Sequence, residues 1–170
     1  MDTFYYFHWA QSKNEILIEP TIAYSDEDLF FGRLPLKEPF ETKIAEGKRL
    51  YDIVHFEDPF NFSISEKVHQ ILNAHRITGW KSYEIVVRDM GKKLFGFQVT
   101  GKCGPLVRPP EAGFVHGYKF DFKTWDGSDF FCPADALSVF CTEKVKDILL
   151  RNKITNLKLE RIDLITWYST

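Results

Sequence analysis

Two aspartates in the second half of the chain have a spacing that could bring both carboxylates to one divalent cation. Asp126 and Asp129 lie three residues apart around Gly127, in the segment TWDGSDFF. A calcium loop needs further ligands at alternating positions, and only Ser128 and Asp129 follow the glycine. Asp-Gly is also a favoured turn dipeptide, and aspartate side chains cap backbone N–H groups in tight turns. We therefore expect the two aspartates to stabilise a turn rather than to bind a metal.

A cysteine and a histidine form a second candidate for chemistry. Cys103 lies in a glycine-rich loop beside Lys102, and a neighbouring lysine can lower the pKa of a thiol. His116, thirteen residues later, is a candidate base. Since a cysteine and a histidine often coincide in sequence without meeting in space, we favour an ordinary loop cysteine. A small hydrolase or transferase centred on Cys103, His116, Asp126 and Asp129 is kept as the alternative function.

Other residues that bind metals or cofactors are not arranged in known patterns. The five histidines show no HExxH spacing, and His69 and His75, six residues apart on one predicted helix, face different ways. The phosphate-binding patterns GxGxxG and GxxxxGK are both absent from the sequence. We therefore expect no metal, no cofactor and no enzymatic activity.

The scaffold that positions these residues contains an internal duplication. The segment SEKVHQILNAHRITGWKSYEI at 65–85 returns as TEKVKDILLRNKITNLKLERI at 142–162, with a constant offset of 77 and nine identities in 21 positions. An ungapped match of this kind indicates one structural unit that is used twice.

Each copy predicts a strand, a helix and a second strand. Ser65 and Thr142 are good N-caps, and the apolar residues that follow recur at i, i+3 and i+4, so they share one buried face. Gly79 and Asn156 tolerate the left-handed backbone that often ends a helix. Segments rich in β-favouring residues come next, and short alternating stretches precede each cap. The predicted second strands are 80–87 and 157–166, and the leading strands carry Phe60, Phe62 and Ile64 in one copy and Leu137, Val139 and Cys141 in the other.

Outside the duplicated segments the chain is predicted to form strands and loops. Phe4–Trp9 and Glu15–Ile22 are separated by a polar cluster, which predicts an N-terminal hairpin. Residues 25–50 predict an irregular stretch with short helical or extended pieces, which could form a binding loop. Further strands are predicted at Leu94–Thr100 and Tyr118–Phe122, on either side of a loop rich in glycine and proline.

These patterns predict one α+β domain over residues 1–170. We expect a mixed, mainly antiparallel sheet with two similar β-α-β units and few helices. The N-terminal hairpin and variable loops occupy 1–57, the first repeat unit 58–90 and the second 118–166. A chain of 170 residues that is 44% hydrophobic and 16% aromatic is long enough and apolar enough to bury a core.

Charge and composition limit the classes of partner. A net charge of −2 and a pI near 6.2 give no reason to attract nucleic acid or an anionic membrane. No apolar stretch reaches the roughly 18 residues of a spanning helix, and the N-terminal segment lacks the features of a signal peptide. We expect a cytoplasmic protein. Its cysteines form no CxxC pair and are expected to be reduced thiols; they are Cys103, Cys132 and Cys141.

A distinctive segment follows the strand predicted at 118–122. It begins with Trp125, Asp126, Gly127, Ser128 and Asp129, continues through a short apolar strand and the second helix copy, and ends with ITNLKLE. This arrangement resembles bacterial immunity proteins of polymorphic toxin systems, and it is most similar to immunity family eleven, a former domain of unknown function. The resemblance covers roughly 58–162. It implies a cytoplasmic protein that binds a cognate toxin and blocks it, without catalytic residues of its own.

An acidic run supplies the candidate partner-binding residues. Asp26, Glu27 and Asp28 precede Phe30 and Phe31, so carboxylates that steer a basic toxin lie beside aromatic rings that could anchor it. An acidic run can also be a solvated loop. A third hypothesis is a module that senses a small ligand, which a large apolar pocket between the repeats would favour. The identity and chemistry of the toxin, the surface that binds it and the association of two copies stay open.

Overall fold

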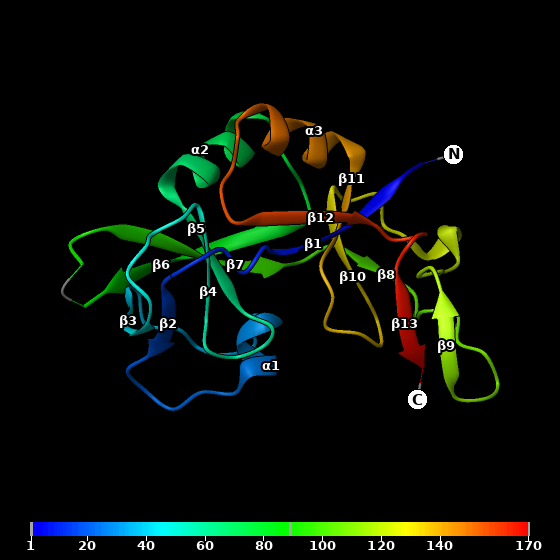
Figure 1. The fold of residues 1–170 in the computed structure, drawn as a ribbon, viewed down its shortest axis with the longest axis horizontal. Coiled ribbons are helices and arrows are strands. Elements are labelled where there is room, and N and C mark those ends of the chain that lie inside the picture. Colours follow the sequence, from blue (N-terminus) through cyan, green and yellow to red (C-terminus); the bar gives the residue numbers. More distant parts are fainter. Residues whose placement is uncertain (1, 89, 170) are drawn as a thin grey trace.

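The computed structural model describes residues 2–88 and 90–169, and it is an α+β structure with few helices (Figure 1). The helices of the described part are α1 (Asp26–Phe30), α2 (Glu66–Ala74), α3 (Glu143–Arg151) and the short 3-10 helix η1 (Phe122–Thr124). The strands are β1 (Phe4–Trp9), β2 (Leu17–Pro20), β3 (Phe40–Glu46), β4 (Ile53–His55), β5 (Phe62–Ser65), β6 (Trp80–Val87), β7 (Lys93–Val99), β8 (Lys102–Cys103), β9 (Gly113–His116), β10 (Phe130–Pro133), β11 (Phe140–Thr142), β12 (Leu157–Arg161) and β13 (Thr166–Ser169).

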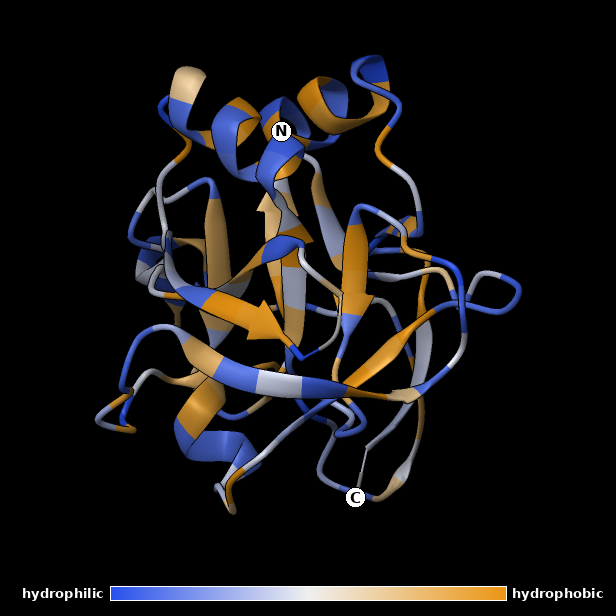
Figure 2. Ribbon diagram, turned by 90° about the vertical axis from the view of Figure 1, so that its left-hand side faces the viewer, coloured by the Kyte–Doolittle hydropathy of each residue, from blue (hydrophilic) through white to orange (hydrophobic). Residues whose placement is uncertain are grey.

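The strands form mixed, mostly antiparallel sheets, which confirms the predicted fold class. One sheet has the order β2-β3-β6-β7-β5-β4 and another the order β12-β1-β11-β10-β8, while β13 and β9 form a separate pair. Only the pairs β3–β6 and β10–β8 are parallel among the described strands. Helices α2 and α3 lie side by side on one side of the sheets, and both mix hydrophilic and hydrophobic residues (Figures 1 and 2). Their buried residues are Val68 and Leu72 in α2 and Val145, Ile148 and Leu149 in α3.

The two copies of the duplicated segment fold alike, which confirms the two β-α-β units. Helices α2 and α3 begin and end at positions 77 residues apart. The chain then leaves each helix through a left-handed residue, Arg76 at φ 51° and Lys153 at φ 52°. A second left-handed residue follows in each copy, Gly79 at φ 80° and Asn156 at φ 59°, just before β6 or β12 starts. The sequence equivalence is therefore also an equivalence of backbone conformation.

The two repeats also contain equivalent central strands that come from different ends of the chain. Repeat 1 has the strand order β6-β7-β5-β4, and repeat 2 has the same order as β12-β1-β11-β10. In repeat 1, Ser65 pairs with Leu94, and in repeat 2 the equivalent Thr142 pairs with Phe4. On the other side, β7 pairs with β6 and β1 pairs with β12 in the same register. Strand β1 therefore occupies in repeat 2 the position that β7 occupies in repeat 1. Each residue of β1 lies 90 positions before its equivalent in β7.

Two equivalent aspartates, Asp52 and Asp129, join the repeats. Each carboxylate accepts a hydrogen bond from the N-cap residue of its own repeat and two from the threonine that follows the helix of the other repeat. For Asp52 the donors are Ser65 Oγ at 2.8 Å and Thr155 N and Oγ1, both at 2.9 Å; for Asp129 they are Thr142 Oγ1 at 3.4 Å and Thr78 N and Oγ1 at 3.0 and 3.2 Å. We call these contacts the two aspartate clamps.

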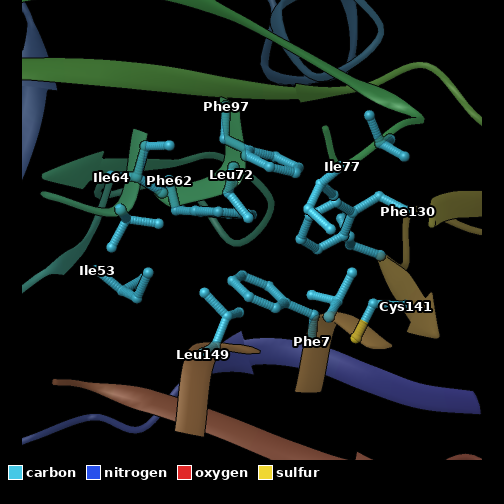
Figure 3. Packing of buried hydrophobic residues seen from close by; sticks show 14 of the residues in the cluster. Phe7, Ile53, Phe62, Ile64, Leu72, Ile77, Phe97, Phe130, Cys141 and Leu149 are labelled. Carbon is cyan, nitrogen blue, oxygen red and sulfur yellow. The ribbon is translucent and has the colours of Figure 1, made fainter. Parts of the chain in front are cut away.

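The largest hydrophobic cluster lies where the repeats meet (Figure 3). Phe7 of β1 and its equivalent Phe97 of β7 stack with their ring centroids 6.1 Å apart. Other pairs of equivalent residues meet in the same cluster, so each repeat buries its apolar face against the other. These pairs include Ile53 and Phe130, Ile64 and Cys141, and Leu72 and Leu149.

Three local predictions are wrong. The predicted N-terminal hairpin does not form, because β1 pairs with β11 and β12 while β2 pairs with β3 in the other sheet. The linker is held by Asn156, whose backbone oxygen accepts from Ala10 N at 3.1 Å and whose Oδ1 accepts from Ser12 N at 3.0 Å. The strand predicted at 118–122 is replaced by an isolated bridge at Phe120 and by η1. The second predicted strand of repeat 2 ends at Arg161, and β13 is a separate element.

Candidate functional site

Helix α1 presents the acidic run and is fixed in place by its apolar residues. Ser25 caps the helix by accepting a hydrogen bond from Asp28 N at 3.3 Å. Carboxylates in the first turn are favoured by the helix dipole, so the acidic residues suit this position. Leu29 is fully buried, and its carbonyl oxygen accepts from Gln98 Nε2 of β7 at 2.8 Å. The acidic end of α1 therefore faces outward, away from strand β7.

The ring of Phe30, which is predicted to bind a partner, belongs to the core. Phe30 is 3% exposed and lies in the cluster between the repeats. Phe31 is half-buried, and its ring meets that of Phe30 edge-on at 5.1 Å. The guanidinium of Arg33 lies 5.0 Å from the centre of the Phe31 ring. Of the two phenylalanines, Phe31 is the more exposed.

Arg33 also neutralises part of the acidic run. Its Nε lies 2.7 Å from Asp28 Oδ1 and its Nη2 lies 3.1 Å from Glu27 Oε1. Both carboxylates remain at least 40% exposed. Burial and the nearby carboxylate of Asp58 raise the pKa of Asp26 above its ordinary value. The run therefore carries less negative charge than three aligned carboxylates suggest.

A groove lies between the chain segments that enter and leave α1. It has a volume of about 460 Å³ and is lined by residues 21–24 and by part of 34–41. Ile22 on its wall is 63% exposed. Residues 21–41 carry five carboxylates against two cationic side chains, a net charge of −3. We call this surface, together with α1, the α1 groove; it combines exposed apolar area with negative charge.

Trp125, Gly127 and the two motif aspartates form a structural turn. Asp126 accepts hydrogen bonds from Ser128 N at 3.0 Å and from Lys102 N at 2.8 Å. Burial alone would raise the pKa of Asp126, but the hydrogen bonds outweigh it and hold the pKa below its ordinary value. Gly127 adopts φ 82°, and Trp125 Nε1 donates to Ser128 O at 3.1 Å. The carboxylate of Asp129 belongs instead to an aspartate clamp.

Of the residues of the alternative site, the structure brings Asp126 close to Cys103 through a hydrogen bond from Lys102 N at 2.8 Å, whereas His116 and Asp129 bind other groups. Cys103 is 4% exposed, and burial raises the pKa of its thiol to about 12. His116 lies on β9, where its Nδ1 is 3.3 Å from Thr166 Oγ1. Asp126 and Asp129 bind different backbone groups. Within 2–88 and 90–169, no group of three or more histidines, cysteines, aspartates or glutamates is arranged to hold a metal ion.

A smaller pocket lies between the two repeats, on the side of α1. Its volume is about 250 Å³, and its walls combine aromatic rings with His8 and Lys158. His8 Nε2 lies 2.9 Å from Glu160 Oε2, and the His8 ring stacks on Tyr6 at 4.7 Å. We call it the inter-repeat pocket; the lining residues used below are Tyr6, His8, Ala10, Phe30, Leu137 and Lys158. Among them, the sequence predicted only Phe30 as a partner-binding residue, although the alternation of Tyr6 and His8 along β1 already placed both side chains on one face of that strand.

The fold and these surfaces define an α+β protein built on a duplicated unit. No protein-family model and no curated protein matches the chain. The resemblance to immunity family eleven therefore depends on the residues quoted above and stays a hypothesis. None of the helices in the described part of the chain combines the length and the apolar character needed to cross a bilayer.

Proposed function

We propose that the protein is an immunity protein that binds a cognate toxin through the α1 groove and so neutralises it. The observation that carries the proposal is the juxtaposition of the acidic end of α1 with an exposed apolar groove of about 460 Å³. The resemblance of the motif around Trp125 to immunity proteins gives the same class. A cytoplasmic location belongs to this proposal, because the resemblance implies it.

Charged and apolar groups make different contributions to binding at protein interfaces. Complementary charge accelerates encounter and orients the partners, whereas apolar contacts in a concave surface supply most of the affinity. The α1 groove offers negative charge at Glu27 and Asp28 and apolar area at Ile22. Its partner is therefore a protein with a basic surface, as toxins that act on nucleic acids have at their active sites.

The test uses the toxin module encoded beside this protein in its genome. The wild-type chain should form a stable complex with that module and should rescue the growth of cells that express it. The triple variant Asp26→Asn, Glu27→Gln and Asp28→Asn should associate about tenfold more slowly at low salt, with the difference shrinking at high salt. Stopped-flow association at two salt concentrations measures this.

A matched control removes three carboxylates that lie outside the α1 groove: Glu84→Gln, Glu111→Gln and Asp147→Asn. This control should associate at the wild-type rate. The proposal fails if the wild-type chain neither binds nor protects. The assignment to the α1 groove fails if both triple variants slow association equally.

A further inference from the structure

The inter-repeat pocket occupies a position that the other repeat fills with its own chain. Equivalent residues of the two repeats can be paired through the register of β1 and β7. His8 is equivalent to Gln98, and Lys158 is equivalent to Lys81. A comparison of these two positions therefore shows what the fold accommodates beneath its central strands.

In repeat 1 the position is occupied by α1. Gln98 Nε2 donates to Leu29 O at 2.8 Å, and Gln98 is only 4% exposed. Gly32 packs so closely that a Cβ there would lie 2.6 Å from Lys81 Nζ and 3.0 Å from Gln98 Oε1. A short peptide segment thus covers this face of repeat 1 and uses the polar side chain of the central strand as a hydrogen-bond partner.

In repeat 2 the equivalent face is open. The His8 side chain is 24% exposed and the Lys158 side chain 50%. Phe30, at the end of α1, lines the pocket, and so does Leu137, in the loop between β10 and β11. In Figure 1 both α1 and this loop lie below the sheets, on the side away from α2 and α3. The pocket is therefore the part of this face that the chain does not fill.

The hydrogen-bonding state of His8 defines the chemistry of an occupant. Burial lowers the pKa of His8 below its ordinary value, despite the opposing effect of Glu160, which favours the neutral ring. Its Nε2 faces the carboxylate of Glu160 at 2.9 Å and must carry the hydrogen. Nδ1 is then an acceptor, and it has no hydrogen-bond partner among the residues that the structure describes. An occupant that satisfies it must bring an N–H or O–H donor.

We propose that the inter-repeat pocket receives an aromatic side chain with a hydrogen-bond donor, a tryptophan or tyrosine of the toxin. This inference rests on the proposed function and deepens it, because Phe30 connects the pocket to α1 and hence to the α1 groove. A volume of about 250 Å³ suits one such side chain, and the aromatic rings that line it favour an aromatic guest. Tryptophan and tyrosine in closed pockets are the commonest anchors of protein interfaces.

The first test measures the pocket without the toxin. N-acetyl-tryptophanamide is titrated into ¹⁵N-labelled protein, with N-acetyl-phenylalaninamide as the matched probe that lacks a side-chain donor. The tryptophan probe should bind with a Kd on the order of 1 mM, should shift the His8 ring nitrogens and the amides of β1, and should bind at least several-fold more tightly than the phenylalanine probe. Equal binding of both probes, or shifts confined to other surfaces, overturns the proposal.

The second test uses an occluding variant in the complex with the toxin module. Ala10→Phe places a ring over the pocket from an exposed lining residue, and Ala74→Phe makes the same change at the exposed end of α2. Ala10→Phe should weaken toxin binding about 10- to 100-fold, whereas Ala74→Phe should leave it at the wild-type value. Thermal melting of both variants checks that each one folds.

The outcomes separate this inference from the function on which it rests. If the wild-type chain does not bind the toxin, the proposed function fails and the inference fails with it. If the wild-type chain binds and Ala10→Phe binds equally well, only the inter-repeat pocket is excluded as an anchor site. If the tryptophan probe binds but Ala10→Phe does not change toxin affinity, the pocket belongs to a small ligand and the proposal is wrong.

Discussion

Removal of the Asp129 carboxylate should destabilise the protein strongly, because it opens one of the two aspartate clamps. The Asp129 side chain is 13% exposed and lies 3.0 Å from Lys144 Nζ. It also accepts from Thr78 N at 3.0 Å and Oγ1 at 3.2 Å, across the boundary between the repeats. The variant Asp129→Ala leaves these donors facing an apolar methyl group.

The size of the effect follows from the hydrogen bonds that the substitution removes. A hydrogen bond to a charged group contributes about 1.5–3 kcal/mol. Because water can reach the exposed side of Thr78, we expect the free energy of unfolding to fall by about 3 kcal/mol and not by the sum of all the lost hydrogen bonds. For a chain of this length, such a decrease lowers Tm by roughly 6–12 °C. Asp52→Ala should cost about as much, because that clamp has the same partners in the other repeat.

Urea unfolding followed by circular dichroism measures the free energy, and Asp121→Ala is the control. Asp121 is exposed and accepts from Lys123 N at 3.0 Å as a local cap, so its removal should cost about 1 kcal/mol or less. If Asp129→Ala is no more destabilising than Asp121→Ala, the carboxylate is not a clamp.

Three further predictions concern the core, the pH dependence and the thiols. Gly96→Ala should lower the free energy of unfolding by about 3 kcal/mol or more, because its Cβ would lie 2.0 Å from the ring of the buried Tyr83. Gly127→Ala has open space around it and should cost only about 1–2 kcal/mol, because of its φ of 82°. Urea unfolding compares the two variants. Burial alone would raise the pKa of Asp52, but hydrogen bonds from Thr155 and Ser65 hold it below the unfolded value of about 3.9. The stabilisation by Asp52 is therefore complete above that unfolded value and is lost as the pH falls below it, so urea midpoints measured from pH 7 to pH 3 should drop less for Asp52→Asn than for the wild type. The cysteines should react slowly with a thiol reagent at pH 8 in the folded state and fully in urea, because burial raises the pKa of each thiol; they are Cys103, Cys132 and Cys141.

The helices of the repeats could be predicted from sequence because their signals are local. Ser65 and Thr142 stand at the N-caps, and the side chain of Ser65 accepts from Val68 N at 3.3 Å. The i, i+3, i+4 pattern needed no knowledge of the partner, since any buried face produces it. The wrong hairpin shows the limit of such signals. An alternating pattern indicates that one face of a strand is buried, but it does not indicate which strand lies beside it.

The position of the acidic run was visible in the sequence, but the surface around it was not. The burial of Phe30 depends on how α1 meets β7, a contact between residues far apart in the chain. The ion pairs with Arg33 lie only five and six residues away and could have been anticipated from charge and distance. The walls of the α1 groove come from segments on both sides of the helix, so their approach required the folded chain.

The duplication explains why the two candidate surfaces lie where the repeats differ. The equivalent positions that make the same contacts in both repeats belong to the scaffold. They are the aspartate clamps, the paired core residues and the two helices. The two repeats differ beneath their central strands, where one repeat carries α1 and the other carries an open pocket. The presence of α1 closes one face and brings acidic residues to the surface, while on the other side His8 Nδ1 has no hydrogen-bond partner within 2–88 and 90–169. A partner that contacts α1 and inserts a side chain into the inter-repeat pocket would therefore bind the features in which the two repeats differ. We expect substitutions in the aspartate clamps to change the stability of the protein without changing its selectivity for a toxin.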